Sequence, residues 1–94
     1  REGISTVLLE AASLKIPIIT TKVPGCIDIV LSEDYGFLCE ASNSQSLIAK
    51  VIEFITIYKR DPGSIDRKVN KVFEHVSKNF NRENIIEKFK LTVQ

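Results

Sequence analysis

The sequence has no apolar run close to the roughly 20 residues that a membrane-spanning helix needs. It also has no excess of charge of one sign, since 13 Lys and Arg residues oppose 12 Asp and Glu residues. This balance gives no electrostatic basis for binding nucleic acid or an anionic membrane surface. We therefore expect neither a nucleic-acid partner nor a transmembrane segment.

Residues that bind metals are scarce. Cys26 and Cys39 are the only cysteines, His75 is the only histidine, and their spacing matches no zinc motif. We therefore expect no metal and no bound cofactor. We interpret the two cysteines as half-buried thiols in a reducing compartment.

The first half of the sequence alternates between helical and extended patterns. A helix is expected over 4–14, with Ser5 and Thr6 as candidate caps, and Pro17 forbids its continuation. Segments 16–21 and 36–39 are short and apolar, as buried parallel strands are. One or two helical turns are expected at 26–31.

The second half is predicted to be helical. Asn43 resembles an N-cap for a helix over 44–58, and Asp61-Pro62-Gly63 breaks the chain. Ser64 is a candidate N-cap for a third long helix, and Asn81 is a candidate N-cap for a last helix. His75 is expected at the surface. The apolar face of the helix over 44–58 consists of Leu47, Ile48, Val51, Ile52 and Ile55, and that of the third long helix includes Val69, Val72, Phe73, Val76 and Phe80.

This order predicts an α/β fold with short parallel strands, flanking helices and a helical carboxyl-terminal half. Two strands are too few for an ordinary parallel sheet, and no strand precedes the first helix. We therefore interpret residues 1–94 as a single partial domain, the carboxyl-terminal portion of a larger one. The alternative is that a partner chain or a second copy supplies further strands.

Glu2 and Glu10 stand with seven residues between them at the start of the first predicted helix. In an α/β domain, the loop from a strand to a helix lies where ligands bind, and the helix N-terminus favours phosphate. Glu2, expected on that loop, and Glu10, expected about one and a half turns into the helix, suit a ligand with hydroxyl groups at both ends and phosphates between. The alternative is two solvent-facing glutamates on a helix.

The opening stretch resembles the signature EGxxxVLLEAxAxGxPVI of the family-4 glycosyltransferases, which are retaining enzymes of the GT-B fold. The matching residues are Glu2, Gly3, Val7, Leu8, Leu9, Glu10, Ala11 and Pro17-Ile18-Ile19. The resemblance continues in later motifs of the family, which occur here in the same order. They are Val23-Pro24-Gly25-Cys26 with Asp28-Ile29-Val30, Gly36-Phe37-Leu38, Asn43 to Leu47 and Phe80 to Glu83. Lys15 departs from the pattern, because the family commonly has Gly there.

The resemblance implies a Rossmann-like domain that binds a nucleotide-diphosphate sugar as substrate. It implies that Glu2 contacts the donor sugar as the catalytic residue, and that Glu10 holds the ribose. Backbone amides around Gly3, Ile4, Ser5, Thr6 and Val7 would face the diphosphate and the sugar. The basic residues that hold the diphosphate, and the amino-terminal acceptor domain, would lie upstream.

The resemblance also implies a place in the cell. The VPGC turn resembles enzymes of capsule, O-antigen and lipid-linked glycan assembly, which implies a cytoplasmic protein, peripheral at the inner face of the membrane. We expect the 94-residue chain alone to be inactive. The alternative hypothesis is a non-catalytic remnant that acts through self-association or a partner chain.

Overall fold

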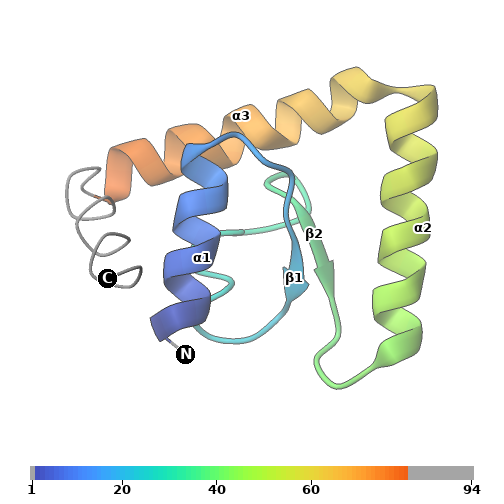
Figure 1. Cartoon of the computed structure of the whole chain (residues 1–94), viewed down its shortest axis with the longest axis horizontal. Helices are drawn as coiled ribbons and strands as arrows, with labels where there is room; N and C mark the ends of the chain where they lie inside the picture. Colours follow the sequence, from blue (N-terminus) through green and yellow to red (C-terminus); the bar gives the residue numbers. More distant parts are fainter. Residues whose placement is uncertain (1, 81–94) are drawn as a thin grey trace.

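The chain folds in the order helix, strand, strand, helix, helix (Figure 1). The computed structural model describes residues 2–80, and side chains from Thr6 onward. The elements are α1 (Glu2–Ser13), β1 (Ile19–Thr21), β2 (Phe37–Cys39), α2 (Ser44–Arg60) and α3 (Pro62–Asn79). The predicted α/β class is confirmed. The helix predicted from Asn81 lies outside the described residues.

The two strands pair in parallel, with Ile19 opposite Phe37 and Thr21 opposite Cys39. The Phe37 N–H donates to the Ile18 carbonyl at 2.9 Å, and the Lys22 N–H donates to the Cys39 carbonyl at 3.0 Å. Both strands are shorter than predicted. Segment 26–31, expected to form one or two helical turns, forms turns that include a hydrogen bond from the Val30 N–H to the Cys26 carbonyl at 2.9 Å, but no regular helix.

α1 begins at Glu2, two residues earlier than predicted. Ser5 and Thr6 therefore lie inside the helix, and their predicted role as caps was wrong. At the other end, Lys15 adopts a left-handed conformation with φ 59°. The Ile16 N–H then reaches the Ala11 carbonyl at 2.9 Å and the Lys15 N–H reaches the Ala12 carbonyl at 3.1 Å. This is a Schellman motif, and it uses Ile16, which was predicted to start the strand.

α2 begins as predicted, because the Asn43 side-chain oxygen accepts a hydrogen bond from the Ser46 N–H at 3.0 Å. Its packing face differs from the predicted one. The row formed by Leu47, Ile48, Val51, Ile52 and Ile55 is exposed. Instead, Phe54 and Ile57 on another side of the helix are half-buried and pack against β2 and α3.

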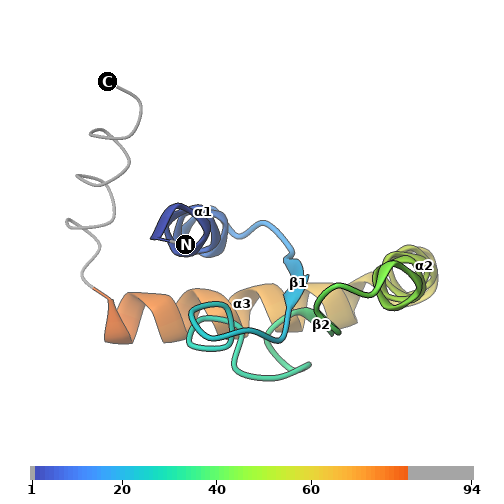
Figure 2. The same ribbon diagram turned by 90° about the horizontal axis from the view of Figure 1, so that it is seen from below.

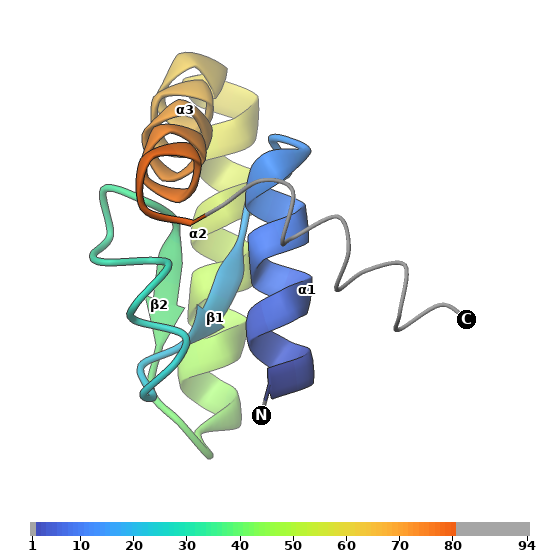
Figure 3. The ribbon, with the colours of Figure 1, turned by 90° about the vertical axis from the view of Figure 1, so that its left-hand side faces the viewer.

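α3 begins at Pro62, so the predicted capping role of Ser64 was wrong. Proline suits the first helical position because no intrahelical partner exists for an N–H there. The helix runs across the ends of α1 and α2 (Figure 1), and Figure 3 shows it nearly end-on above the strands. Its buried row consists of Ile65, Val69, Val72 and Val76.

The core has two parts because α1 and α2 lie on different sides of the strands (Figure 2). One part joins α1, α3 and the turns after β1, and it includes Leu8, Ala12, Cys26, Ile29, Val30, Val72 and Val76. The other joins Phe37 with Ile65 and Val69. Cys26 and Cys39 are fully buried free thiols rather than half-buried ones.

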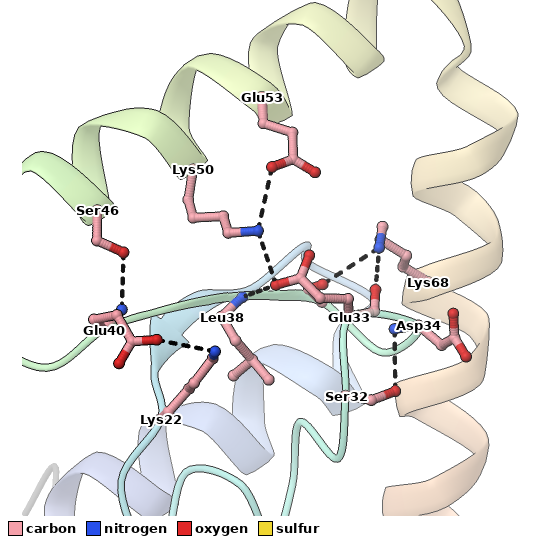
Figure 4. Close-up of polar contacts among 11 residues, drawn as sticks. Lys22, Ser32, Glu33, Asp34, Leu38, Glu40, Ser46, Lys50, Glu53 and Lys68 are labelled. Carbon is pink, nitrogen blue, oxygen red and sulfur yellow. Dashed lines mark hydrogen bonds and ion pairs between the residues drawn. The ribbon is translucent and has the colours of Figure 1, made fainter.

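A polar cluster closes the outer edge of β2 (Figure 4). The Glu33 carboxylate accepts the Leu38 N–H at 2.8 Å and contacts the Lys50 ammonium at 3.1 Å. The Lys68 ammonium donates to the backbone carbonyls of Glu33 and Gly36. A neighbouring strand would have to displace Glu33 to reach Leu38, so the sheet ends at β2.

Candidate functional site

The carboxyl ends of both strands and the N-terminal end of α1 lie at the same end of the molecule (Figure 1). Parallel strands place their following loops at one edge, and this edge is where open α/β sheets bind ligands. The first turn of a helix also has backbone N–H groups without intrahelical partners, which favour an anion. The site predicted from the opening stretch therefore lies at the edge where such sites occur.

The predicted site residues all lie in α1. Glu2, Gly3, Ile4 and Ser5 form its first turn. Thr6 is half-buried and Val7 is exposed. Glu10 is half-buried, and its carboxylate makes no hydrogen bond or ion pair with the described side chains.

Two expectations for the glutamates are corrected. Glu2 lies in the helix rather than on the preceding loop, because α1 begins there. Glu10 is consequently about two turns into the helix, rather than one and a half. The two residues differ by eight positions, which corresponds to about 12 Å along the axis and about 80° around it. Both residues therefore lie on one side of α1.

A cavity of about 560 Å³ lies at the same edge, between the strands and the start of α2. None of the predicted site residues lines it. Its polar lining includes Thr20, Glu40 and Asn43. Glu40 is held in place, because its N–H donates to the Ser46 hydroxyl at 2.9 Å and its carboxylate pairs with Lys22 at 3.0 Å. The sequence signal for this cavity is the set of polar residues directly after β2, namely Glu40, Ser42, Asn43 and Ser44.

The segment after β1 carries Asp28, another acidic residue of the matched motifs. The Asp28 side chain is exposed and makes no hydrogen bond or ion pair with the side chains described from Thr6 to Phe80. Its carbonyl accepts a hydrogen bond from His75 Nε2 at 2.9 Å. His75 had been predicted to lie at the surface, but it is half-buried.

Within residues 2–80, no three His, Cys, Asp or Glu side chains form a group that could hold a metal ion. No helix in that range is long and apolar enough to cross a membrane.

Similarity to known proteins is confined to sequence. Residues 1–68 match the family model of the group 1 glycosyl transferases. The chain is 38% identical over 55 residues to the capsular polysaccharide biosynthesis glycosyltransferase CapM of Staphylococcus aureus. That alignment covers 58% of this chain and 14% of CapM. It is also 30% identical over 84 residues to WcaL of Salmonella typhimurium, which is named as a colanic acid biosynthesis glycosyltransferase. That alignment covers 89% of this chain and 20% of WcaL. No solved structure matches it significantly.

The chain thus spans 14% and 20% of the lengths of these two curated relatives. The family match covers the two glutamates, both strands, α2 and the start of α3. The match to the family model extends over well more than half of the sequence, and the parallel strands agree with the fold that the resemblance implied. The chain belongs to the group 1 glycosyl transferases.

Proposed function

We propose that this chain is the part of a retaining glycosyltransferase that binds a nucleotide-diphosphate sugar. The observation that carries the proposal is the position of Glu2 and Glu10 on one side of α1, whose N-terminal end lies at the carboxyl edge of parallel strands. This arrangement supports a donor that runs along the first two turns of α1. Its diphosphate would lie near the free N–H groups of the first turn.

The two glutamates take different parts of the donor in this proposal. Glu10 accepts hydrogen bonds from the ribose hydroxyl groups, and Glu2 contacts the sugar that is transferred. Charge-assisted hydrogen bonds of this kind contribute roughly 1.5–3 kcal/mol each. The leaving diphosphate is stabilised electrostatically by the amides of the first turn and by basic residues from an upstream segment.

We further propose that the whole protein contains an amino-terminal acceptor domain and acts in cell-surface glycan synthesis. The names of CapM and WcaL support capsule or related polysaccharide assembly. Nucleotide sugars are made in the cytoplasm, so the protein would work there, at the inner face of the membrane. Transfer would need both domains, because in this proposal the amino-terminal domain binds the acceptor.

The test is donor-dependent steady-state kinetics on the full-length protein. Glu10→Ala should raise the donor KM about tenfold or more, because a bond made in both ground state and transition state is lost. Glu2→Ala should mainly lower kcat, because contacts to the reacting sugar strengthen in the transition state.

Asp66→Ala is the matched control, since Asp66 is an exposed carboxylate on α3 far along the chain from the glutamates. This variant should keep wild-type kinetics, and circular dichroism should show all three variants folded. Wild-type KM and kcat in both glutamate variants would refute the assignment of the site.

A second candidate function is supported by the exposed apolar row of α2. In this alternative, the chain is a non-catalytic remnant that acts by associating with itself or with a partner chain. The upstream reading frame distinguishes the two. A continuous frame that encodes the rest of the donor domain favours the enzyme, and a start codon close to Arg1 favours the remnant.

A further inference from the structure

Lys22 and Glu40 form an ion pair across the carboxyl ends of the two strands. Lys22 follows β1 directly, and its N–H donates to the Cys39 carbonyl at 3.0 Å, so the parallel ladder continues to Lys22. The Lys22 ammonium lies 3.0 Å from the Glu40 carboxylate. Both strands point toward the end of the molecule where α1 begins (Figure 1), so the pair lies at the edge to which the donor is assigned.

The pair also lies on the α1 side of the strands. Side chains alternate between the two faces of a strand, so Lys22 shares a face with Thr20 and with Leu38, the partner of Thr20. Leu38 belongs to the part of the core that contains Leu8 of α1. Figure 4 agrees, since it shows the Lys22 and Glu40 side chains on the side of β2 to which Leu38 points, away from α2.

Lys22 is the only basic side chain at this edge within residues 6–80. The other basic residues of this range lie after the C-terminal end of α1, on α2 from its second turn onward and on α3, namely Lys15, Lys50, Lys59, Arg60, Arg67, Lys68, Lys71 and Lys78. α3 crosses the far ends of α1 and α2 (Figure 1), and Lys50 is paired with Glu33 at the outer edge of β2. A cation at the donor edge of the described chain therefore has to be Lys22.

The geometry leaves the Lys22 ammonium able to bind an anion. Its side chain is 51% exposed, and an ammonium group has three N–H donors. Within the described residues it donates to the Glu40 carboxylate alone. Glu40 is itself held in place, because its N–H donates to the Ser46 hydroxyl at 2.9 Å. Glu40 therefore keeps a long, flexible side chain at the edge while further N–H donors of that side chain stay accessible.

We propose that Lys22 binds the diphosphate of the donor, together with the first turn of α1. The inference rests on the proposed function and deepens it by assigning a cation of this chain to the leaving group. The N–H groups of the helix and the ammonium at the strand end both favour a phosphate anion. Glu40 aims the ammonium, but its own negative charge opposes the diphosphate, so the two residues act on the anion with opposite signs.

The dissociation constant of inorganic pyrophosphate, measured by isothermal titration calorimetry on the full-length protein, tests this contact. Lys22→Ala should raise the constant about fivefold, as for loss of one partly exposed charge-assisted hydrogen bond, and Lys22→Arg should restore it. Glu40→Gln should lower the constant about twofold, because the amide oxygen still accepts the Lys22 N–H while the opposing charge is gone.

Lys59→Ala is the matched control. Lys59 is exposed and lies in the last turn of α2, at the other end of the molecule (Figure 1). This variant removes the same charge as Lys22→Ala and should leave the constant unchanged. Urea denaturation should show all the variants close to wild type, because an exposed ion pair contributes little to stability.

Opposite signs in the two members of the pair are the signature of this role. An ion pair that only ties the strand ends together would give an unchanged constant in Lys22→Ala, or equal rises in Lys22→Ala and Glu40→Gln. Either result, or an equal rise in Lys59→Ala, would overturn the proposal. Failure of the proposed function has another signature, a wild-type donor KM in Glu10→Ala, and the pyrophosphate titration still reports on Lys22 in that case.

Discussion

Gly36 lies directly before β2, at a position with no room for a side chain. A Cβ atom there would stand 2.9 Å from the Ile18 carbonyl oxygen and 3.1 Å from a methyl group of Val30. The oxygen belongs to the backbone of the neighbouring strand and accepts the Phe37 N–H, so it has little freedom to move. Gly36→Ala should therefore lower the free energy of unfolding by about 1–3 kcal/mol, measured by urea denaturation.

Gly63 provides the control for this prediction. A Cβ atom at Gly63 would meet side-chain atoms of Asp61 and Arg67 only at 3.6 Å and 3.7 Å, which is ordinary contact. Gly63 also lies in the first turn of α3, where alanine has the better helix propensity. Gly63→Ala should leave stability unchanged or slightly raised. Equal losses in both variants would contradict the steric explanation.

Single residues differ in how far their roles were predictable. Asn43 was identified as a cap because its bond to Ser46 is local in sequence. Lys15 was identified as a departure from glycine, and its φ of 59° confirms the left-handed backbone there. His75 was misplaced because its partner, Asp28, lies 47 residues away. A contact over such a separation leaves no periodic signal in the sequence.

At the scale of elements, β2 depends on one carboxylate. Glu33→Ala would leave the Leu38 N–H without an acceptor at a partly buried strand edge, which costs about 1–3 kcal/mol. Glu33→Gln should cost less, because its amide oxygen still accepts that N–H. The measurement is the free energy of unfolding of both variants. A larger loss in Glu33→Gln than in Glu33→Ala would contradict this role.

Lys50 contributes to the same element through charge. Burial opposes its charged form, but hydrogen bonds to Glu33 and Glu53 outweigh burial and raise the pKa of Lys50. A base with a raised pKa stabilises the fold below its unfolded pKa, and the contribution disappears as pH rises through the raised value. The Lys50 contribution should therefore persist through neutral pH and disappear only under strongly alkaline conditions.

α2 shows why an apolar pattern predicts that a helix forms more reliably than it predicts which face of the helix is buried. The row Leu47 to Ile55 has the correct spacing for a buried face, and it is exposed, with Ile48 and Ile52 each 57% accessible. The helix instead packs through Phe54 and Ile57, which do not belong to this row of apolar residues. Periodicity detects an apolar stripe, but only the neighbouring elements determine whether that stripe is covered.

At the scale of the whole molecule, this exposed row predicts self-association of the 94-residue chain. Ile48→Glu with Ile52→Glu should shift the chain towards monomer, because two charges would then have to be buried in any contact through the row. Sedimentation velocity at several concentrations measures the shift. A wild-type chain that is monomeric at all concentrations would contradict the prediction.

The matched control places the same charges elsewhere on α2. Ala49 and Thr56 are exposed and lie outside the apolar row. Ala49→Glu with Thr56→Glu adds two carboxylates without entering the row, so association should persist. Equal dissociation in both double variants would indicate a general charge effect rather than contact through the row.

The overall architecture was largely predictable. The short apolar segments 16–21 and 36–39 predicted the parallel pair, and the two long helices follow strong periodic patterns. The crossing of α3 over both other helices was not predictable, because it depends on contacts of Ile65 to Val76 with residues early in the chain. The position of Glu2 inside α1 was missed because Ser5 and Thr6, whose residue types favour caps, indicated a later start for the helix.

The closure of β2 by Glu33 has a consequence for how this fold can be extended. Of the two strand edges in residues 2–80, the outer edge of β2 is occupied by a side chain of its own segment, and the remaining edge is that of β1. Strands can therefore be added in one direction only. The fold serves as the last unit of a sheet and is unsuited to its middle, so a fusion or graft that uses this domain would succeed only with its new strand beside β1.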